Sequence, residues 1–164
     1  MSEGWGNYLG IDPGKSGGLA LITMTGMPTP FKVTTWKMPA TEADLWEVLE
    51  RMPKGTLAIL ERVHAMPKQG VTSCFTFGQG YGMLKMGLIA ARISFINPTP
   101  QAWMKRLSFS TKGDKNNSKR KAQELFPMVP KITHAIADAL LLAEYGRRMH
   151  SETVSKSHRT RSKL

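Results

Sequence analysis

Three acidic residues lie inside or directly after apolar runs of the sequence. Asp12 directly follows the strand-like run NYLGI, and Glu61 closes the continuous apolar run GTLAILE. Asp138 lies inside HAIADALLLA, where a carboxylate among Ala and Leu is expected to be partly buried. Because burying an unpaired carboxylate is unfavourable, such a group requires a nearby cation. His134 stands four residues before Asp138 and therefore on the same face of a helix.

Carboxylates with an imidazole and no thiol form a ligand set that suits Mg²⁺, with Mn²⁺ as a substitute, better than zinc. Two such ions about 4 Å apart can activate water and stabilise the leaving oxygen during phosphodiester hydrolysis. Asp12, Glu61, His134 and Asp138 therefore predict a metal-dependent hydrolytic site. An alternative stays open, in which Asp12 and Glu61 are turn and strand-end residues and Asp138 pairs with a surface base.

The segment around Asp12, LGIDPGKSGG, also looks like a phosphate-binding loop in which Lys15 would contact a nucleotide. A P-loop requires four residues between its first glycine and the Gly-Lys-Ser triplet, and a helix after it. Here only three residues separate Gly10 from Gly14, and the apolar, strand-like run GLALITM follows. The spacing argues against nucleotide binding and leaves Asp12 as the residue to be explained.

Three strand-like runs open the sequence, and helices and further strands follow them. Apolar or alternating runs predict strands at 7–11, 18–24, 31–38, 55–61 and 94–97, and amphipathic or Ala/Leu-rich runs predict helices at 41–52, 81–92, 101–107, 118–126 and 133–149. A loop is expected at 64–80. A helix lies between the first and fourth strands, so these two are expected to be parallel neighbours with Asp12 and Glu61 at one sheet edge. The order predicts an α/β fold with a mixed five-stranded sheet flanked by helices.

The chain carries an excess of positive charge, with 23 Lys and Arg against 12 Asp and Glu and a net charge of +11. This excess favours a polyanionic partner, with nucleic acid ahead of an anionic membrane. Residues 1–149 are expected to form one domain, which is long enough to bury a core. Residues 150–164 are basic, lack apolar periodicity and are expected to be a disordered tail.

The composition also excludes several classes of protein. The single cysteine, Cys74, excludes an internal disulfide framework and a Cys-based zinc site. No run reaches the roughly 18 apolar residues of a transmembrane helix, and the N-terminus lacks the apolar core of a signal peptide. We therefore expect a soluble protein in the cytoplasm of a bacterium or a phage-infected host cell. The terminal SKL matches a peroxisomal address, which we interpret as coincidental.

Three segments resemble the motif regions of the RuvC-like Holliday junction resolvases, especially the phage-type branch: GIDPGKSGGLALI, AILERVHAMPKQGVTSCFTFGQGYG and HAIADALLLAEYGRR. They occur in the family's order within residues 7–149. The resemblance implies an RNase H-like fold, a homodimer, and Mg²⁺-dependent resolution of four-way DNA junctions by paired symmetric nicks. It also implies that Asp12, Glu61 and Asp138 are metal-binding catalytic acids.

The chain departs from the family's pattern at the fourth ligand, which precedes the last Asp and is usually an acid, sometimes a His. Ala135 stands three residues before Asp138, so we assign His134, at four, as the substitute. Lys115, in GDKNNSK, resembles the basic residue that the family places near the scissile phosphate, although it also fits a solvated loop charge.

Basic and polar residues beside the predicted site are expected to contact DNA. Lys68 and Gln69 follow the strand that ends in Glu61, where the family inserts a loop into the junction centre. The other candidates are Lys15, Lys112, Lys115, Lys119 and Arg120. The run YGMLKMGLIAAR (81–92) is apolar on every broad side, which fits either a dimer interface or burial against the domain's own sheet. The resemblance favours the dimer.

Other function classes stay open. A nuclease of the same fold that cuts RNA–DNA hybrids, or branched DNA more broadly, would use the same acids. A non-catalytic DNA-binding module would need only the basic residues, and converging carboxylates argue against it because they gain nothing from phosphate. An actin-like or sugar-kinase ATPase needs two such subdomains, and this chain has room for one.

Overall fold

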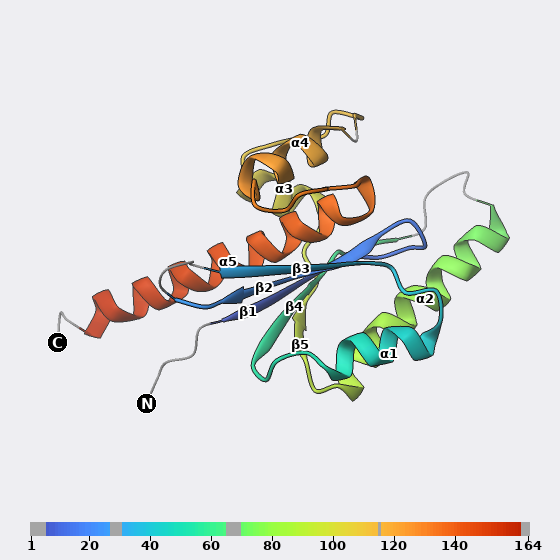
Figure 1. Cartoon of the computed structure of the whole chain (residues 1–164), viewed down its shortest axis with the longest axis horizontal. Helices are drawn as coiled ribbons and strands as arrows, with labels where there is room; N and C mark the ends of the chain where they lie inside the picture. Colours follow the sequence, from blue (N-terminus) through green and yellow to red (C-terminus); the bar gives the residue numbers. More distant parts are fainter. Residues whose placement is uncertain (1–5, 27–30, 65–69, 115, 162–164) are drawn as a thin grey trace.

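A mixed five-stranded sheet forms the centre of the molecule (Figure 1). The computed structural model describes residues 6–26, 31–64, 70–114 and 116–161, with side chains up to Ser151. The strands are β1 (Asn7–Asp12), β2 (Gly18–Met24), β3 (Phe31–Lys37), β4 (Thr56–Leu60) and β5 (Ser94–Ile96), in the sheet order β3-β2-β1-β4-β5. Pairs β1–β2 and β2–β3 are antiparallel, and pairs β1–β4 and β4–β5 are parallel. The mixed five-stranded sheet predicted from the sequence is confirmed.

Helices cover both faces of this sheet (Figure 1). α1 (Glu42–Glu50) and α2 (Val71–Ala90) pack on one face. α3 (Pro100–Arg106), α4 (Asn116–Leu125) and α5 (His134–Arg161) pack on the other. α1 lies in the connection from β3 to β4 and begins at a Thr41 cap, whose Oγ1 accepts from the Asp44 N–H at 3.1 Å. This connection returns the chain to the sheet so that β4 runs parallel to β1.

Strand alternation divides the core into two layers. In β1, Leu9 and Ile11 pack with α1 and α2, whereas Tyr8 packs with α5. Because successive side chains of a strand point to opposite faces, Asp12 at the end of β1 belongs to the α5 face. The same alternation along β4 places Glu61 on that face. The two acids are therefore directed to the layer that contains α5.

α5 rests on the sheet at two glycines. A Cβ added to Gly10 would lie 1.9 Å from the carbonyl oxygen of Ala139, and one added to Gly18 would lie 2.5 Å from that of Ala135. Both distances are far below van der Waals contact, so only glycine lets the backbone of α5 come this close. The approach fixes how near the first turns of α5 lie to the carboxyl end of β1.

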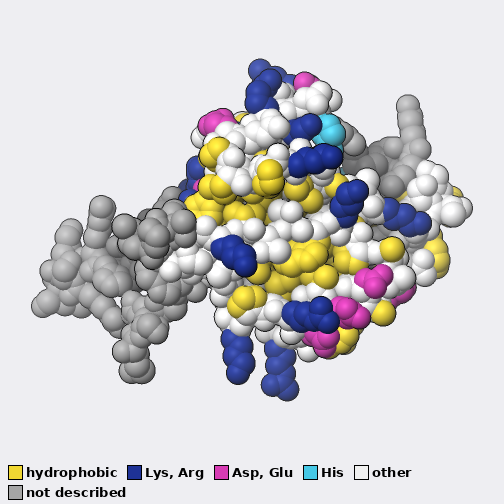
Figure 2. All heavy atoms as spheres, viewed as in Figure 1, with side chains coloured by type: hydrophobic (Ala, Val, Ile, Leu, Met, Phe, Trp, Pro, Cys, Tyr) yellow, Lys and Arg dark blue, Asp and Glu magenta, His cyan; other side chains and the backbone are white. Residues whose placement is uncertain are grey.

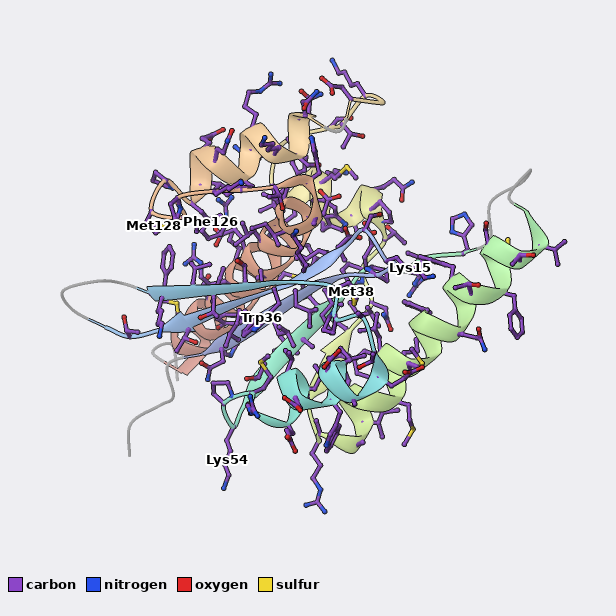
Figure 3. The ribbon with its side chains drawn as sticks, turned by 45° about the vertical axis from the view of Figure 1, so that its right-hand side comes forward. Lys15, Trp36, Met38, Lys54, Phe126 and Met128 are labelled. Atoms are coloured by element: carbon purple, nitrogen blue, oxygen red, sulfur yellow. The ribbon has the colours of Figure 1, made fainter. Side chains whose placement is uncertain are left out.

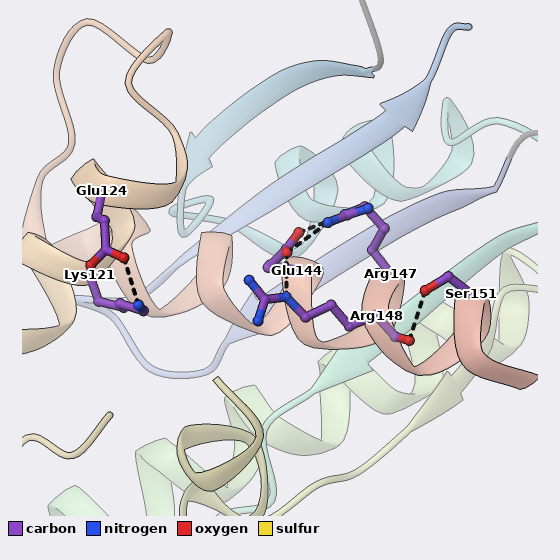
Figure 4. A network of polar contacts seen from close by, with 6 residues as sticks. All are labelled: Lys121, Glu124, Glu144, Arg147, Arg148 and Ser151. Atoms are coloured by element: carbon purple, nitrogen blue, oxygen red, sulfur yellow. Dashed lines mark hydrogen bonds and ion pairs between the residues drawn. The ribbon is translucent and has the colours of Figure 1, made fainter. Parts of the chain in front are cut away.

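Glu144, in the middle of α5, pairs with two arginines of the same helix (Figure 4). The side chain is buried, and its oxygens accept from Arg147 Nε at 2.7 Å, Arg147 Nη2 at 2.8 Å and Arg148 Nε at 2.7 Å. Burial alone would raise the pKa of Glu144, but the hydrogen bonds and charges of the two arginines outweigh it and lower the pKa. The Arg147 guanidinium also lies 5.9 Å from the ring centroid of Phe31, which links α5 to β3.

α2 begins earlier than the sequence predicted. We expected a loop at 64–80, but the helix starts at Val71, and its first turn already donates to the carbonyl oxygen of Gly70. Glycines at 78, 80 and 82 lower the helix propensity of this half. A helix whose other half is held in the core by Leu84 and Leu88 can nevertheless be extended without a new nucleation step.

α5 is also longer than expected. Residues 150–164 were expected to be disordered, yet the helix continues through Arg161. No proline follows residue 130, so an anchored helix can propagate through this polar segment one hydrogen bond at a time. The other element boundaries lie within two residues of those predicted. Over the ranges that the structure describes, no helix combines the length and apolarity needed to cross a membrane.

Gly10→Ala is expected to destabilise the fold, because the new Cβ must displace α5 from β1. The free energy of unfolding should fall by about 2–4 kcal/mol, measured by urea denaturation followed by circular dichroism. Gly80→Ala in α2 is the matched control, because nothing lies within 4 Å of an added Cβ there. Alanine should favour that helix by up to about 1 kcal/mol. Equal stability of Gly10→Ala and the parent would contradict the contact described above.

Glu144→Gln is expected to weaken the pH dependence of stability. The pKa of Glu144 is lower in the folded protein than its ordinary value of 4.5. Its interactions therefore stabilise the fold above that pH, and the stabilisation is lost as the pH falls through the folded-state pKa. The variant should lose roughly 1–2 kcal/mol at neutral pH and show a flatter decline on acidification.

Urea denaturation of both proteins over a series of pH values measures this difference. Glu47→Gln is the control, because the ion pair of Glu47 with Arg51 is exposed on α1 and should contribute little. Parallel stability profiles for the parent and Glu144→Gln would show that Glu144 does not carry this pH dependence.

Candidate active site

Two of the predicted acids lie at the same end of the sheet, where the parallel strands β1 and β4 finish. Asp12 is the last residue of β1, and Glu61 directly follows β4. The two strands are parallel neighbours with Ile11 opposite Leu60, and the Glu61 N–H donates to the carbonyl oxygen of Ile11 at 3.2 Å. The prediction that these strands are parallel neighbours is confirmed.

The first turns of α5 lie over this edge. The backbone of α5 contacts Gly10 and Gly18, and Gly18 is the β2 partner of Asp12. Asp138 is half-buried in this part of the helix, near enough to Glu61 for its charge to raise the pKa of that residue. Acids from β1, β4 and α5, far apart in the sequence, are therefore brought to the same end of the sheet.

Glu61 has a raised pKa. Burial is the largest cause, and the charge of Asp138 adds to it, while a hydrogen bond from Trp103 acts in the opposite direction. Two carboxylates that disfavour each other's charge in a half-buried place are stabilised by a cation between them. Carboxylate oxygens are the donors that Mg²⁺ and Mn²⁺ prefer, and His134 stands one helical turn before Asp138.

His134 is the first residue of α5, and its side chain is exposed. Within the parts of the chain that the structure describes, no three His, Cys, Asp or Glu side chains stand close enough together to hold one ion. The charge of Asp138 acts on Glu61, and Asp12 is directed to the same face of the sheet. Ionised carboxylates repel one another, so a tighter cluster requires a cation to offset that repulsion.

Three residues beside Glu61 were not found from the sequence. Trp103, fully buried in α3, donates from Nε1 to Glu61 Oε1 at 2.9 Å. Asn97, after β5, donates from Nδ2 to the carbonyl oxygen of Leu60 at 2.9 Å and to the Tyr81 hydroxyl at 3.1 Å. These contacts join positions 42, 37 and 16 residues apart, so no local pattern reveals them. The one local signal is that Trp103 and Tyr81 each carry a polar N–H or O–H group on a large apolar ring. Such a group usually has a hydrogen-bond partner when the ring is buried.

Lys15 lies in the β1–β2 turn next to Asp12 and is exposed. Together with Met38 it lines a cavity of about 580 Å³ bounded by this turn, the start of α1 and the N-terminal half of α2 (Figure 3). Hydroxyl groups from α2 line the same cavity, at Thr72, Ser73 and Thr76. Lys15 is therefore at the end of the sheet where β1 finishes, on the side of α1 and α2, whereas Asp12 and Glu61 are directed to the α5 face. Its contact with DNA stays a prediction.

The other basic candidates gather around α4. Arg120 is exposed on this helix and donates to Asn117 Oδ1, Lys119 is half-exposed, and Lys112 is exposed in the turn before it. Figure 2 shows several Lys and Arg side chains on the part of the molecule formed by α3 and α4. Three further candidates lie outside the described residues: Lys68, Gln69 and Lys115.

Known structures share this fold. No protein-family model matches the chain, and neither does any curated protein sequence. Thermus thermophilus RuvC matches with a TM-score of 0.62 at 19% identity, over 88% of this chain and 96% of that one. The T. thermophilus RuvC complex with a Holliday junction substrate matches with 0.61 at 17% identity, over 87% and 96%.

The yeast mitochondrial Holliday junction resolvase Ydc2 matches with a TM-score of 0.56 at 13% identity, over 96% of this chain and 86% of that one. These likenesses extend over 86% or more of each chain, so the fold as a whole is shared. The chain therefore has the RNase H-like fold of the RuvC structures, as its sequence motifs predicted.

Proposed function

We propose that this protein is a metal-dependent endonuclease that resolves four-way DNA junctions by paired symmetric nicks. The observation that carries the proposal is the position of Asp12 and Glu61 at the carboxyl ends of β1 and β4, beneath the part of α5 that carries Asp138. Ligand sites of such sheets form at this edge. Structures of similar fold include a RuvC bound to its junction substrate and a mitochondrial junction resolvase, which supports this substrate class.

The three acids would hold Mg²⁺, for which Mn²⁺ would substitute, and His134 is the fourth ligand in this proposal. When bound, the cation supplies the charge that activates water and stabilises the leaving oxygen of a phosphodiester. The protein supplies the placement of the ligands. β1 and β4 fix the backbones of Asp12 and Glu61, α5 sets the position of Asp138, and partial burial strengthens the attraction of Glu61 to a cation.

Positive charge around the site would bind the DNA backbone. The net charge is +11, and Lys15 lies beside Asp12 while Lys112, Lys119 and Arg120 lie at or before α4. Lys68, Gln69 and Lys115 complete the proposed DNA-binding set, with Lys115 near the scissile phosphate. Binding through phosphates should weaken as the salt concentration rises, because counterions compete for the same contacts.

A nuclease for RNA–DNA hybrids is the second candidate, since the same acids on the same fold would serve it. A four-way DNA junction and a hybrid duplex of equal length, tested side by side, separate the two. The group of carboxylates at the sheet edge also argues against a DNA-binding module without catalysis, because a phosphate binder gains nothing from them.

The acids are tested by Asp12→Asn, Glu61→Gln and Asp138→Asn, which keep the shape of each side chain and remove its charge. Cleavage of a synthetic four-way junction in Mg²⁺ should fall by several orders of magnitude in each variant, while junction binding in a gel-shift assay survives. Glu47→Gln, on the exposed side of α1, is the matched control and should cut like the parent. An Asp12→Asn protein that cuts at the parent's rate would show that the site is misassigned.

The fourth ligand is tested in the same assay by titrating Mg²⁺. His134→Ala should need more Mg²⁺ for half-maximal cleavage, because one ligand is lost, whereas His134→Asp should not. An equal Mg²⁺ requirement in the parent and both variants would remove His134 from the site and leave the three acids in place.

The exposed side of α2 is the surface on which we place a homodimer contact. Leu84 and Leu88 of this helix are buried in the domain's own core. Steps of three or four residues connect exposed positions along the opposite side: Val71, Phe75, Gly78, Gly82, Met86 and Ile89. Such spacing forms one helix face. The side chains of Val71, Phe75, Met86 and Ile89 are 87%, 67%, 61% and 58% exposed, which is unusual for four large apolar groups on one face.

A second copy of the chain fits this face best. One active site cuts one strand, and paired nicks in a junction require two sites related by two-fold symmetry. Around Gly78 and Gly82 nothing lies within 4 Å of an added Cβ, so two α2 helices could approach closely there. The sequence left two uses open for this helix, a dimer interface and burial against the domain's own sheet. Leu84 is buried in the domain's own core, whereas Met86 is exposed and free to contact a second copy in the proposed dimer.

Met86→Glu is expected to give a monomer that binds junctions but resolves them poorly. Light scattering should give the parent a mass near twice 18.2 kDa and the variant about half of that. Met128→Glu is the control, because Met128 is 56% exposed but lies outside α2, between α4 and α5 (Figure 3). A parent protein that is monomeric at micromolar concentration, both free and on the junction, would contradict the dimer and favour single-strand nicking.

A further inference from the structure

We infer that Trp103 is a positioning residue that holds Glu61 in the orientation needed to bind the metal ion. This inference rests on the proposed function. Its starting point is the hydrogen bond from Trp103 Nε1 to Glu61 Oε1, 2.9 Å long, between a fully buried indole and a half-buried carboxylate. Neither residue is near the other in the sequence, so α3 must be docked for the contact to form.

The backbone around Glu61 is already fixed on both sides. The Glu61 N–H donates to the carbonyl oxygen of Ile11 at 3.2 Å, and the Arg62 N–H donates to that of Pro98 at 2.8 Å. The carbonyl oxygen of Leu60 accepts from the side chain of Asn97 at 2.9 Å. The torsions of the Glu61 side chain are the freedom that remains, and a hydrogen bond to one carboxylate oxygen restricts them.

A tryptophan suits this task because its N–H is a neutral donor. Lysine or arginine at the same place would also fix the carboxylate, but their charge would compete with a divalent cation for it. The indole occupies Oε1 and leaves the charge of the carboxylate, and its second oxygen, for the metal ion. Groups that orient a metal ligand in this way commonly change metal affinity or activity by about 10–100-fold when removed.

The indole itself is held rigidly. Trp103 belongs to the core cluster beneath α5, and its ring lies 5.6 Å from that of Phe109 at an interplanar angle of 48°. α3 is fixed at its start by Thr99, whose Oγ1 accepts from the Ala102 N–H at 3.3 Å. Because the indole N–H has so little freedom to move, it holds the Glu61 carboxylate in a well-defined position.

Trp103→Phe tests the inference, because phenylalanine keeps an aromatic ring in the core and removes only the donor and part of the ring volume. The affinity of the full-length protein for Mn²⁺, measured by calorimetry without DNA, should fall about 10-fold. The Mg²⁺ concentration for half-maximal junction cleavage should rise in parallel, and junction binding should stay unchanged. Phe109→Leu is the control, since it disturbs the same packing and keeps the Nε1–H, so it should reduce stability with no change in Mn²⁺ affinity.

Two outcomes of the affinity measurements would overturn the inference: Mn²⁺ affinity equal to the parent in Trp103→Phe, or equal losses in Trp103→Phe and Phe109→Leu. Glu61→Gln separates this failure from failure of the proposed function. If Glu61→Gln loses Mn²⁺ binding and Trp103→Phe does not, the metal site stands and the positioning role falls. If Glu61→Gln also binds Mn²⁺ like the parent, the metal site itself is wrong.

A second measurement needs no variant and serves if Trp103→Phe fails to fold. In a proton–nitrogen correlation spectrum of the parent, the Trp103 indole N–H signal should shift on addition of Mg²⁺, because its acceptor gains a cation. The indole signal of Trp46, 40% exposed on α1 at the opposite face of the sheet, should not shift. A Trp103 signal that stays in place at saturating Mg²⁺ would contradict the inference.

Discussion

Helix α5 lies on β1 at Gly10, where a Cβ would come within 1.9 Å of the carbonyl oxygen of Ala139. This contact allows the helix backbone, rather than a layer of side chains, to pack against the strand. The position of Asp138 relative to the ends of β1 and β4 follows from it, because Asp138 is the neighbour of Ala139. A side chain at position 10 would lift the helix and move Asp138 away from Glu61. The candidate site therefore depends on a residue that takes no part in its chemistry.

The two acids on the inner part of α5 show how a structural carboxylate differs from a site carboxylate. Glu144 is followed at three and four positions by Arg147 and Arg148, and both donate to it. Asp138 is followed at the same positions by leucines. Local arginines lower the pKa of Glu144 despite its burial, whereas Asp138 acts on Glu61 as a like charge that raises the pKa of that residue. The arginines of its own helix stabilise the charge of Glu144, whereas the charge of Asp138 disfavours the ionised form of Glu61.

The sequence was sufficient for the features that local pattern and connection geometry determine. The five strands, the parallel pairing of β1 with β4 and the placement of Asp12 beside Glu61 follow from apolar runs and from the helix between them. The start of α2 and the end of α5 did not follow, because a helix anchored at one end continues through residues whose own propensity is low. The hydrogen bond from Trp103 to Glu61 could not be predicted, since it joins two elements that only the folded core brings together.

α2 connects the proposed dimer surface to the candidate site. Its outer side carries Phe75 and Met86, both exposed, and its inner side carries Leu84 in the core. Between these sides, the Tyr81 hydroxyl accepts from Asn97, and the same amide group donates to the carbonyl oxygen of Leu60, one residue before Glu61. A force that displaced α2 would therefore reach the backbone of Glu61 through two hydrogen bonds. Because packed cores deform little, the geometry at the sheet edge and the position of α2 are determined together.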